Sequence, residues 1–112
     1  MDKNFLIEKT VDIIRDADEQ NLKYDYDDGY IVEFIENGKL YNIKFSRRIF
    51  GLFSYIRLSE TYHNLVGFRI NRKDFKILKK SYFDREEVFR KERLNRLFPD
   101  KKRDDVLNEI LK

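Results

Sequence analysis

The stretch "YIVEFIENGKLYNIKF", residues 30–45, decides the fold, because it contains two strands of a hairpin and the turn between them. Asn37-Gly38 is the residue pair that a type I′ turn requires, since both central positions need a positive φ. A two-residue turn there places Phe34 opposite Tyr41, and most of the apolar side chains then share one face of the strands. The turn and the alternation therefore predict the same register.

Further strands are expected on both sides of this hairpin. A short strand is predicted at 22–27, a central strand at 49–59, and two more strands at 65–70 and 75–80. The apolar residues of the last segment also fit helical spacing. A helix that starts at Asn71 is therefore the alternative prediction for this part of the chain.

The N-terminal segment 5–20 predicts an amphipathic helix, with Asp2 or Asn4 as its cap and Asn21 at its end. Its core-facing side chains are expected to be Leu6, Ile7, Val11, Ile13, Ile14 and Ala17.

Two further helices are predicted near the C-terminus. Asp84, followed three residues later by Glu87, has the pattern of a helix N-cap. This helix is expected to run to about Phe98 and to stop at Pro99. A final short helix is predicted within 100–112.

The predicted fold class is α+β: an N-terminal helix, an antiparallel sheet of four to six strands and two C-terminal helices. Residues 1–112 are expected to form one domain. Cysteine is absent, which excludes disulfides. No signal peptide and no apolar run of roughly 18 residues is visible, so we expect a cytoplasmic protein without a membrane partner.

Charge is divided unevenly along the chain, although the formal net charge is only +3. Residues 1–38 carry 4 basic and 11 acidic groups, whereas residues 39–80 carry 11 basic and 2 acidic groups. The remaining residues are nearly balanced, with 9 basic and 8 acidic groups. An acidic beginning followed by a strongly basic middle indicates a surface of two signs.

No pattern in the chain is typical of an enzyme or a cofactor site. His63 is the single histidine, and a lone histidine between two predicted strands is more typical of a loop than of a catalyst. The acidic segment 25–29 lacks the spacing of a calcium loop, so it predicts a turn. The glycines are scattered and form no phosphate loop. We therefore expect a non-enzymatic protein without cofactor or metal.

The basic middle of the chain predicts contact with nucleic acid or a nucleoprotein complex. Ten of the 17 aromatic residues fall within residues 39–83, and basic groups interleaved with aromatic rings suit phosphates and stacked bases. The residues expected to contact phosphates are Arg47, Arg48, Arg69, Arg72, Lys73, Lys76, Lys79 and Lys80. The alternative is that the rings form the core and the basic groups only protect exposed strands from aggregation.

Acidic side chains on the outer side of the first helix predict a second, protein-binding surface. They follow one another at steps of four, four and three residues: Glu8, Asp12, Asp16 and Glu19. The alternative function is therefore a protein-binding inhibitor of the immunity or anti-defence type, which docks through its acidic helix and basic sheet. The alternative for these acids is a solvated helix face. Few Ala and Pro and many Lys, Ile, Asn and Tyr indicate an AT-rich coding sequence of a bacterium, phage or other mobile element.

Overall fold

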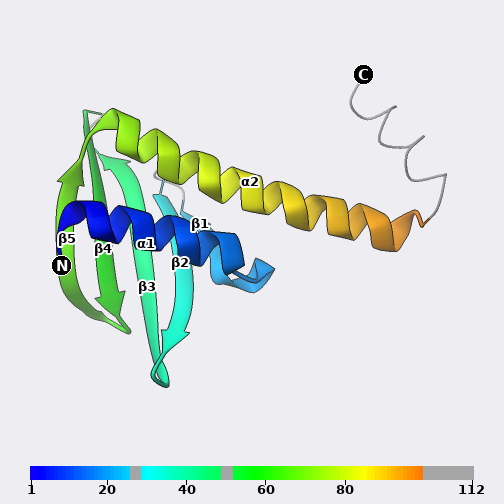
Figure 1. Cartoon of the computed structure of the whole chain (residues 1–112), viewed down its shortest axis with the longest axis horizontal. Coiled ribbons are helices and arrows are strands. Elements are labelled where there is room, and N and C mark those ends of the chain that lie inside the picture. Colours follow the sequence, from blue (N-terminus) through cyan, green and yellow to red (C-terminus); the bar gives the residue numbers. More distant parts are fainter. Residues whose placement is uncertain (26–28, 49–51, 100–112) are drawn as a thin grey trace.

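Five antiparallel strands form one sheet, in which each strand lies next to its neighbours in the chain. The computed structural model describes residues 1–25, 29–48 and 52–99. Figure 1 shows the two helices, α1 (Lys3–Asp16) and α2 (Arg72–Leu97), crossing the same face of this sheet. The α+β class with a helix at the N-terminal side, an antiparallel sheet and a C-terminal helix is therefore confirmed. The strands are β1 (Leu22–Asp25), β2 (Gly29–Glu36), β3 (Lys39–Arg48), β4 (Phe53–Glu60) and β5 (His63–Ile70).

Asn37 and Gly38 lie between β2 and β3 with φ angles of 53° and 76°. Both values fall in the left-handed region that type I′ turns use. Phe34 lies opposite Tyr41 across the two strands, and the two rings stack with their centroids 5.5 Å apart. Alternate side chains of both strands therefore point toward the helices.

The core lies between the helices and the face of the sheet that they cover. Side chains of α1 and α2 pack there against alternate residues of β2, β3 and β4. The opposite face carries polar and charged side chains, among them Lys44, Arg48 and Arg57. Functional side chains must therefore come from this open face, from the sheet edges or from the outer sides of the helices. The most deeply buried apolar side chains are Leu6, Ile14, Tyr30, Val32, Ile43, Phe45, Ile56, Phe75 and Leu78.

Helix α1 begins at the predicted cap but ends earlier than the predicted residue 20. The Asp2 carboxylate accepts a hydrogen bond from the Phe5 amide at 2.7 Å. The helix ends at Asp16, and Glu19–Asn21 form a short 3-10 turn, η1. Arg85 of α2 donates two hydrogen bonds, at 2.9 and 2.8 Å, to the carbonyl of Ala17. A side chain of α2 thus donates hydrogen bonds to one of the carbonyls that the end of α1 leaves without a backbone partner.

The prediction of a strand at 75–80 is wrong, because α2 is continuous from Arg72 to Leu97. Its N-cap is Asn71, whose side-chain oxygen accepts a hydrogen bond from the Asp74 amide at 2.7 Å. The alternative, a helix that starts at Asn71, is the correct one. Burial explains the outcome, since the residues of α2 that the sheet and α1 bury recur at helical spacing: Phe75, Leu78, Tyr82 and Phe89.

The predicted N-cap at Asp84 is also wrong. Asp84 lies inside α2, where its carboxylate accepts a hydrogen bond from the Lys80 ammonium group at 2.8 Å. Acidic residues two and three positions later suggested a helix start, but here they belong to the middle of the helix. Helix α2 ends before Pro99, and the predicted final helix within 100–112 lies outside the described residues. Within the described ranges, no helix is long and apolar enough to cross a membrane.

Candidate functional site

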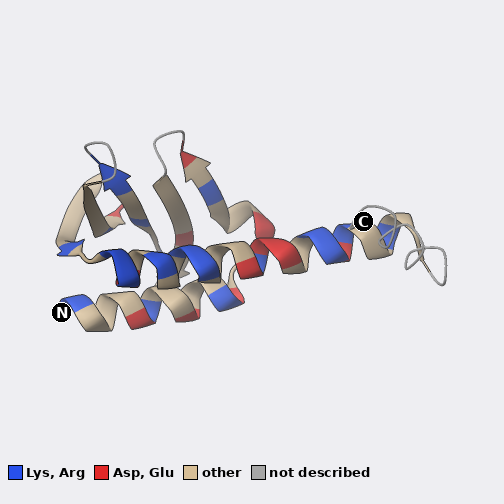
Figure 2. Ribbon diagram, turned by 90° about the horizontal axis from the view of Figure 1, so that it is seen from above, with Lys and Arg blue, Asp and Glu red and all other residues tan. Residues whose placement is uncertain are grey.

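Basic side chains gather at one end of the sheet, where β3 and β5 finish. Strands β3 and β5 run in the same direction because β4 between them is antiparallel to both. The last residues of β3 and β5 therefore lie at the same end of the sheet, and α2 begins there directly after β5. Figure 2 shows Lys and Arg concentrated on the first half of α2 and at the end of β3. The basic face, as we define it, consists of Arg47, Arg48, Arg69, Arg72, Lys73, Lys76, Lys79 and Lys80.

These eight residues are the ones that the sequence predicted to contact phosphates. The structure brings them together, but it places five of them on α2 rather than on strands. They also lie on two sides of the sheet. Arg48 and Arg69 belong to the open face, whereas Arg47 lies on the helix-covered side, with its guanidinium carbon 5.9 Å from the centroid of the Phe75 ring.

Aromatic rings position the two arginines of the open face. The guanidinium carbon of Arg69 lies 3.9 Å from the centroid of the Phe53 ring, and that of Arg48 lies 4.7 Å from the centroid of Tyr55. Arg48 and Phe53 are also direct cross-strand neighbours. Arginine stacks well on aromatic faces and keeps its hydrogen-bond donors available at the rim of the guanidinium plane. Both side chains can therefore bind an anion without losing their ring contacts.

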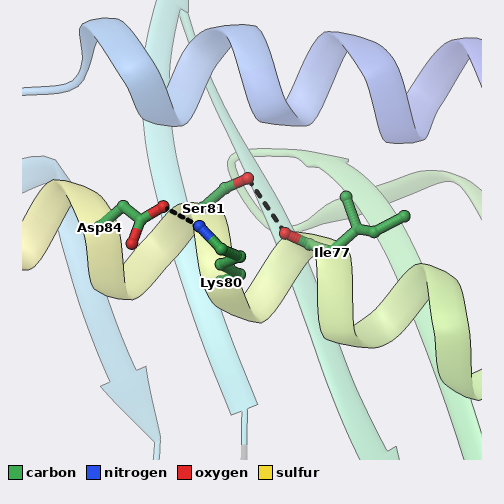
Figure 3. A network of polar contacts seen from close by, with 4 residues as sticks. All are labelled: Ile77, Lys80, Ser81 and Asp84. Carbon is green, nitrogen blue, oxygen red and sulfur yellow. Dashed lines mark hydrogen bonds and ion pairs between the residues drawn. The ribbon is translucent and has the colours of Figure 1, made fainter.

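The remaining basic residues form a stripe along α2. At about 100° per residue, Arg72, Lys76 and Lys79 fall on the side of the helix opposite to Ser81 and Val88, which face α1. Lys73 and Lys80 lie beside them, on the side opposite to the buried residues of α2. Figure 3 shows Ser81 on the side toward α1, with its hydroxyl donating to the Ile77 carbonyl at 3.0 Å. The stripe therefore points away from α1, toward the end of the sheet where β3 and β5 finish.

The stripe costs folding stability. Arg72, Lys76 and Lys80 follow one another at i,i+4 spacing, where like charges are unfavourable by a few tenths of a kcal/mol per pair. Arg72 and Lys73 in the first turn also oppose the helix dipole, which Asp74 of the same turn partly offsets. Asp84 offsets Lys80, as Figure 3 shows. A bound anion would relieve the remaining repulsion, so the arrangement favours an anionic partner.

Two exposed aromatic rings beside the stripe were missed by the sequence analysis. Tyr24 of β1 is 58% exposed and Phe83 of α2 is 49% exposed. Their ring centroids lie 5.2 and 5.7 Å from that of the buried Tyr30, which stands between them. Phe83 follows Lys79 and Lys80 at helical spacing, which is the one sequence signal for it. Nothing in the sequence brings Tyr24 to the same place.

The hydroxyl of Tyr82, next to these rings, carries no charge at neutral pH. Burial, together with the nearby Glu86 and Tyr24, raises the pKa of Tyr82 to about 12. Tyr82 therefore adds no negative charge beside the basic face below pH 10.

The open face of the sheet contains three buried polar atoms that have no hydrogen-bond partner among the described residues: Ser46 Oγ, Tyr55 Oη and Arg57 Nε. Ser46 and Tyr55 are direct cross-strand neighbours, so their hydroxyls lie on the same face of the sheet. Burial by itself would raise the pKa of Tyr55, yet the Ser46 hydroxyl and the positive charges of Arg48 and Lys44 lower it overall. The open face is therefore electropositive around Tyr55.

The four acidic residues predicted as a protein-binding surface lie on α1 and on the η1 turn that follows it. Glu19 belongs to η1 and forms an ion pair with Arg93 of α2. Glu8 and Asp12 lie on the side of α1 that faces Asp74 of α2. Asp12 and Asp16 border a groove of about 480 Å³ between α1 and the end of β2. This acidic groove, as we call it, is also lined by Asp18, Glu36 and Lys9, and by Glu33, whose carboxylate forms an ion pair with Lys23.

His63, the only histidine, is exposed at the start of β5, opposite Glu60 of β4. Within the described part of the chain, no three histidine or acidic side chains come close enough together to hold a metal ion.

No protein-family model, curated protein or solved structure matches this chain. Function is therefore inferred from the charges, exposed rings and contacts of the chain itself.

Proposed function

We propose that this is a small, non-enzymatic binding or regulatory protein of a bacterium or phage, which contacts nucleic acid or a nucleoprotein complex through its basic face. The observation that carries this proposal is that eight basic residues of β3, β5 and α2 gather at one end of the sheet, on both of its faces. Sequence neighbours on a helix can share a charge by chance. Here the strand order also brings Arg47 and Arg48 to the residues that begin α2.

Phosphate contacts explain why such a face is useful. Each basic group that neutralises a phosphate releases condensed counterions, which supplies affinity and makes binding depend on salt. Arginine binds phosphate oxygens with two parallel hydrogen bonds, whereas lysine acts as a point charge. Arg48 and Arg69, held on aromatic rings, would fix the position of the backbone, and the lysines of α2 would add charge along it.

The test is a fluorescence-anisotropy titration of labelled single- and double-stranded DNA and RNA at low salt. We expect binding that weakens steeply between about 50 and 200 mM salt. The double variant Lys73→Gln/Lys76→Gln should lower affinity about 10-fold at low salt and flatten the log–log salt slope by roughly 2 units, or about one per lost phosphate contact. Both side chains are exposed, so folding should be unaffected.

The matched control is Lys91→Gln/Arg96→Gln, which removes two exposed positive charges from the same helix beyond its acidic segment. This control should leave affinity and salt slope nearly unchanged. Equal losses in the two double variants would mean that only net charge matters and that the basic face is no specific site. Absence of binding to every nucleic acid would reject the proposal.

The acidic groove favours a second candidate function, docking of a partner protein by an inhibitor of the immunity or anti-defence type. Its acidic residues come from α1, from β2 and from Asp18 between α1 and η1, and its lining also includes the apolar Ile13 and Phe34. A groove lined by both acidic and apolar residues suits a basic segment of another protein.

Reversal of charge tests this second function. Asp12→Lys/Asp16→Lys should abolish capture of a basic partner from a bacterial lysate, while Glu8→Lys/Glu92→Lys, which changes the net charge equally, should not. A captured set that is the same for wild type and both variants would show that the acids of the groove are only solvated.

A further inference from the structure

We propose that the basic face binds single-stranded nucleic acid in preference to duplex, with bases stacked on the exposed rings of Tyr24 and Phe83. This inference rests on the proposed function and names the class of nucleic acid that the same surface takes. It requires that the rings be held in place, that they lie beside the phosphate-binding cations, and that a duplex cannot use them.

The two rings are held by the core. Tyr30 is 2% exposed and lies between them, tilted by 59° from Tyr24 and by 80° from Phe83. Phe83 also packs edge-on against the buried Tyr82, with centroids 5.8 Å apart. Each exposed ring therefore has one side fixed against aromatic neighbours while about half of its side chain remains in contact with solvent. Such a ring can receive a base without first being ordered.

The rings lie at one end of the basic stripe. The Lys79 ammonium group is 6.0 Å from the centroid of Tyr30, the ring that both Tyr24 and Phe83 contact. Lys79 and Lys80 precede Phe83 by four and three residues, so the three side chains are neighbours on the helix surface. Phosphates bound along the stripe would therefore lead a strand directly to the rings.

The charge pattern also gives the strand an end point. Beyond Phe83 the helix carries Glu86 and Glu87, and Glu87 is ion-paired with Arg90. Figure 2 shows this acidic segment directly after the basic part of α2. Acidic and basic groups alternate from there on, so positive charge no longer accumulates and the bases at the rings would belong to the end of a short bound segment.

A duplex cannot use these rings in the same way. Its bases are stacked on one another and present only their edges in the grooves, whereas an unpaired base offers its whole face to an aromatic side chain. The stripe from Arg72 to Lys80 is also short, about 12 Å at 1.5 Å per residue. A flexible single strand can follow such a stripe and still place bases on the rings.

The first experiment uses Phe83→Trp, because the chain contains no tryptophan and the emission of a single tryptophan can be excited apart from that of the seven tyrosines. Oligonucleotides of about 12 nucleotides fall within the size that small single-strand-binding domains cover. We expect the single strand to quench the fluorescence and to bind about 10-fold more tightly than the corresponding duplex. The control is Leu40→Trp, at the far end of β3, whose fluorescence should not change.

The second experiment removes the rings. Tyr24→Ala and Phe83→Ala should each weaken single-strand binding about 10-fold, because stacking contributes an affinity of this order per base. Duplex binding and the salt slope should stay the same, since no phosphate contact is lost. Tyr24→Phe should retain wild-type affinity, because it keeps the ring and removes only the hydroxyl.

The outcomes separate the two proposals. Equal affinity for single strand and duplex, with Phe83→Trp unquenched, would overturn the single-strand inference and leave binding by the basic face intact. Failure of every nucleic acid to bind would overturn both.

Discussion

Phe45→Ala is expected to lower the free energy of unfolding by about 3–5 kcal/mol, the usual cost of removing a buried aromatic ring. Phe45 is 0% exposed and stacks on Tyr30 with centroids 5.3 Å apart. It also meets the Phe75 ring of α2 edge-on at 6.1 Å. Its removal therefore leaves a cavity where the sheet packs on α2. Urea unfolding followed by circular dichroism measures the loss.

Leu40→Ala provides the control within the same strand. Leu40 is 46% exposed on the opposite end of β3, so its truncation should cost about 0.5 kcal/mol or less. A loss below about 1 kcal/mol for Phe45→Ala would contradict the aromatic core described above. Because Tyr30 also supports Tyr24 and Phe83, Phe45→Ala should loosen the rings beside the basic face as well.

Ser81→Pro is expected to cost about 3 kcal/mol or more, because it places proline inside α2. Proline has no amide hydrogen to donate to the Ile77 carbonyl, and its ring clashes with that carbonyl. The same substitution would be tolerated if 75–80 were a strand and a helix began near Asp84, since residue 81 would then belong to a connection. Thermal unfolding of the variant therefore distinguishes the two structures.

Ser81→Ala separates the backbone effect from that of the side chain. It removes only the hydroxyl that donates to the Ile77 carbonyl at 3.0 Å, and alanine is the best helix former. Its stability should stay within about 0.5 kcal/mol of wild type. If Ser81→Pro lost as little stability as Ser81→Ala, α2 would not be continuous through this position.

The sequence predicted correctly those features that depend only on residues within one short segment. Asn37 and Gly38 adopt positive φ, and the strands beside them pair Phe34 with Tyr41 in the register that the two-residue turn implies. The start of α1 is equally local, since the Asp2 carboxylate caps an amide three residues later. Each of these features depends on neighbours in sequence, so periodicity and capping rules reach them.

Local signals failed where two periods fit the same residues. Phe75 and Ile77 alternate as in a strand, whereas Phe75, Leu78 and Tyr82 fit helical spacing. Asp84 has the sequence of a cap wherever it lies. Packing decides between them, because a helix buries Phe75, Leu78 and Tyr82 together against the sheet and α1. The end of α1 depends likewise on Arg85, a residue of α2 that reaches the Ala17 carbonyl.

The sequence by itself determined that the chain is an α+β protein and that positive charge accumulates between residues 39 and 80. Alternation, turn chemistry and charge can be read within one segment at a time. Only the tertiary structure decided that α2 carries most of the basic face and that the arginines of β3 and β5 lie near its start. It also decided that Tyr24 and Phe83 contact the same ring, that of Tyr30. These are contacts between elements, and they depend on strand order, on register and on which helix face is buried.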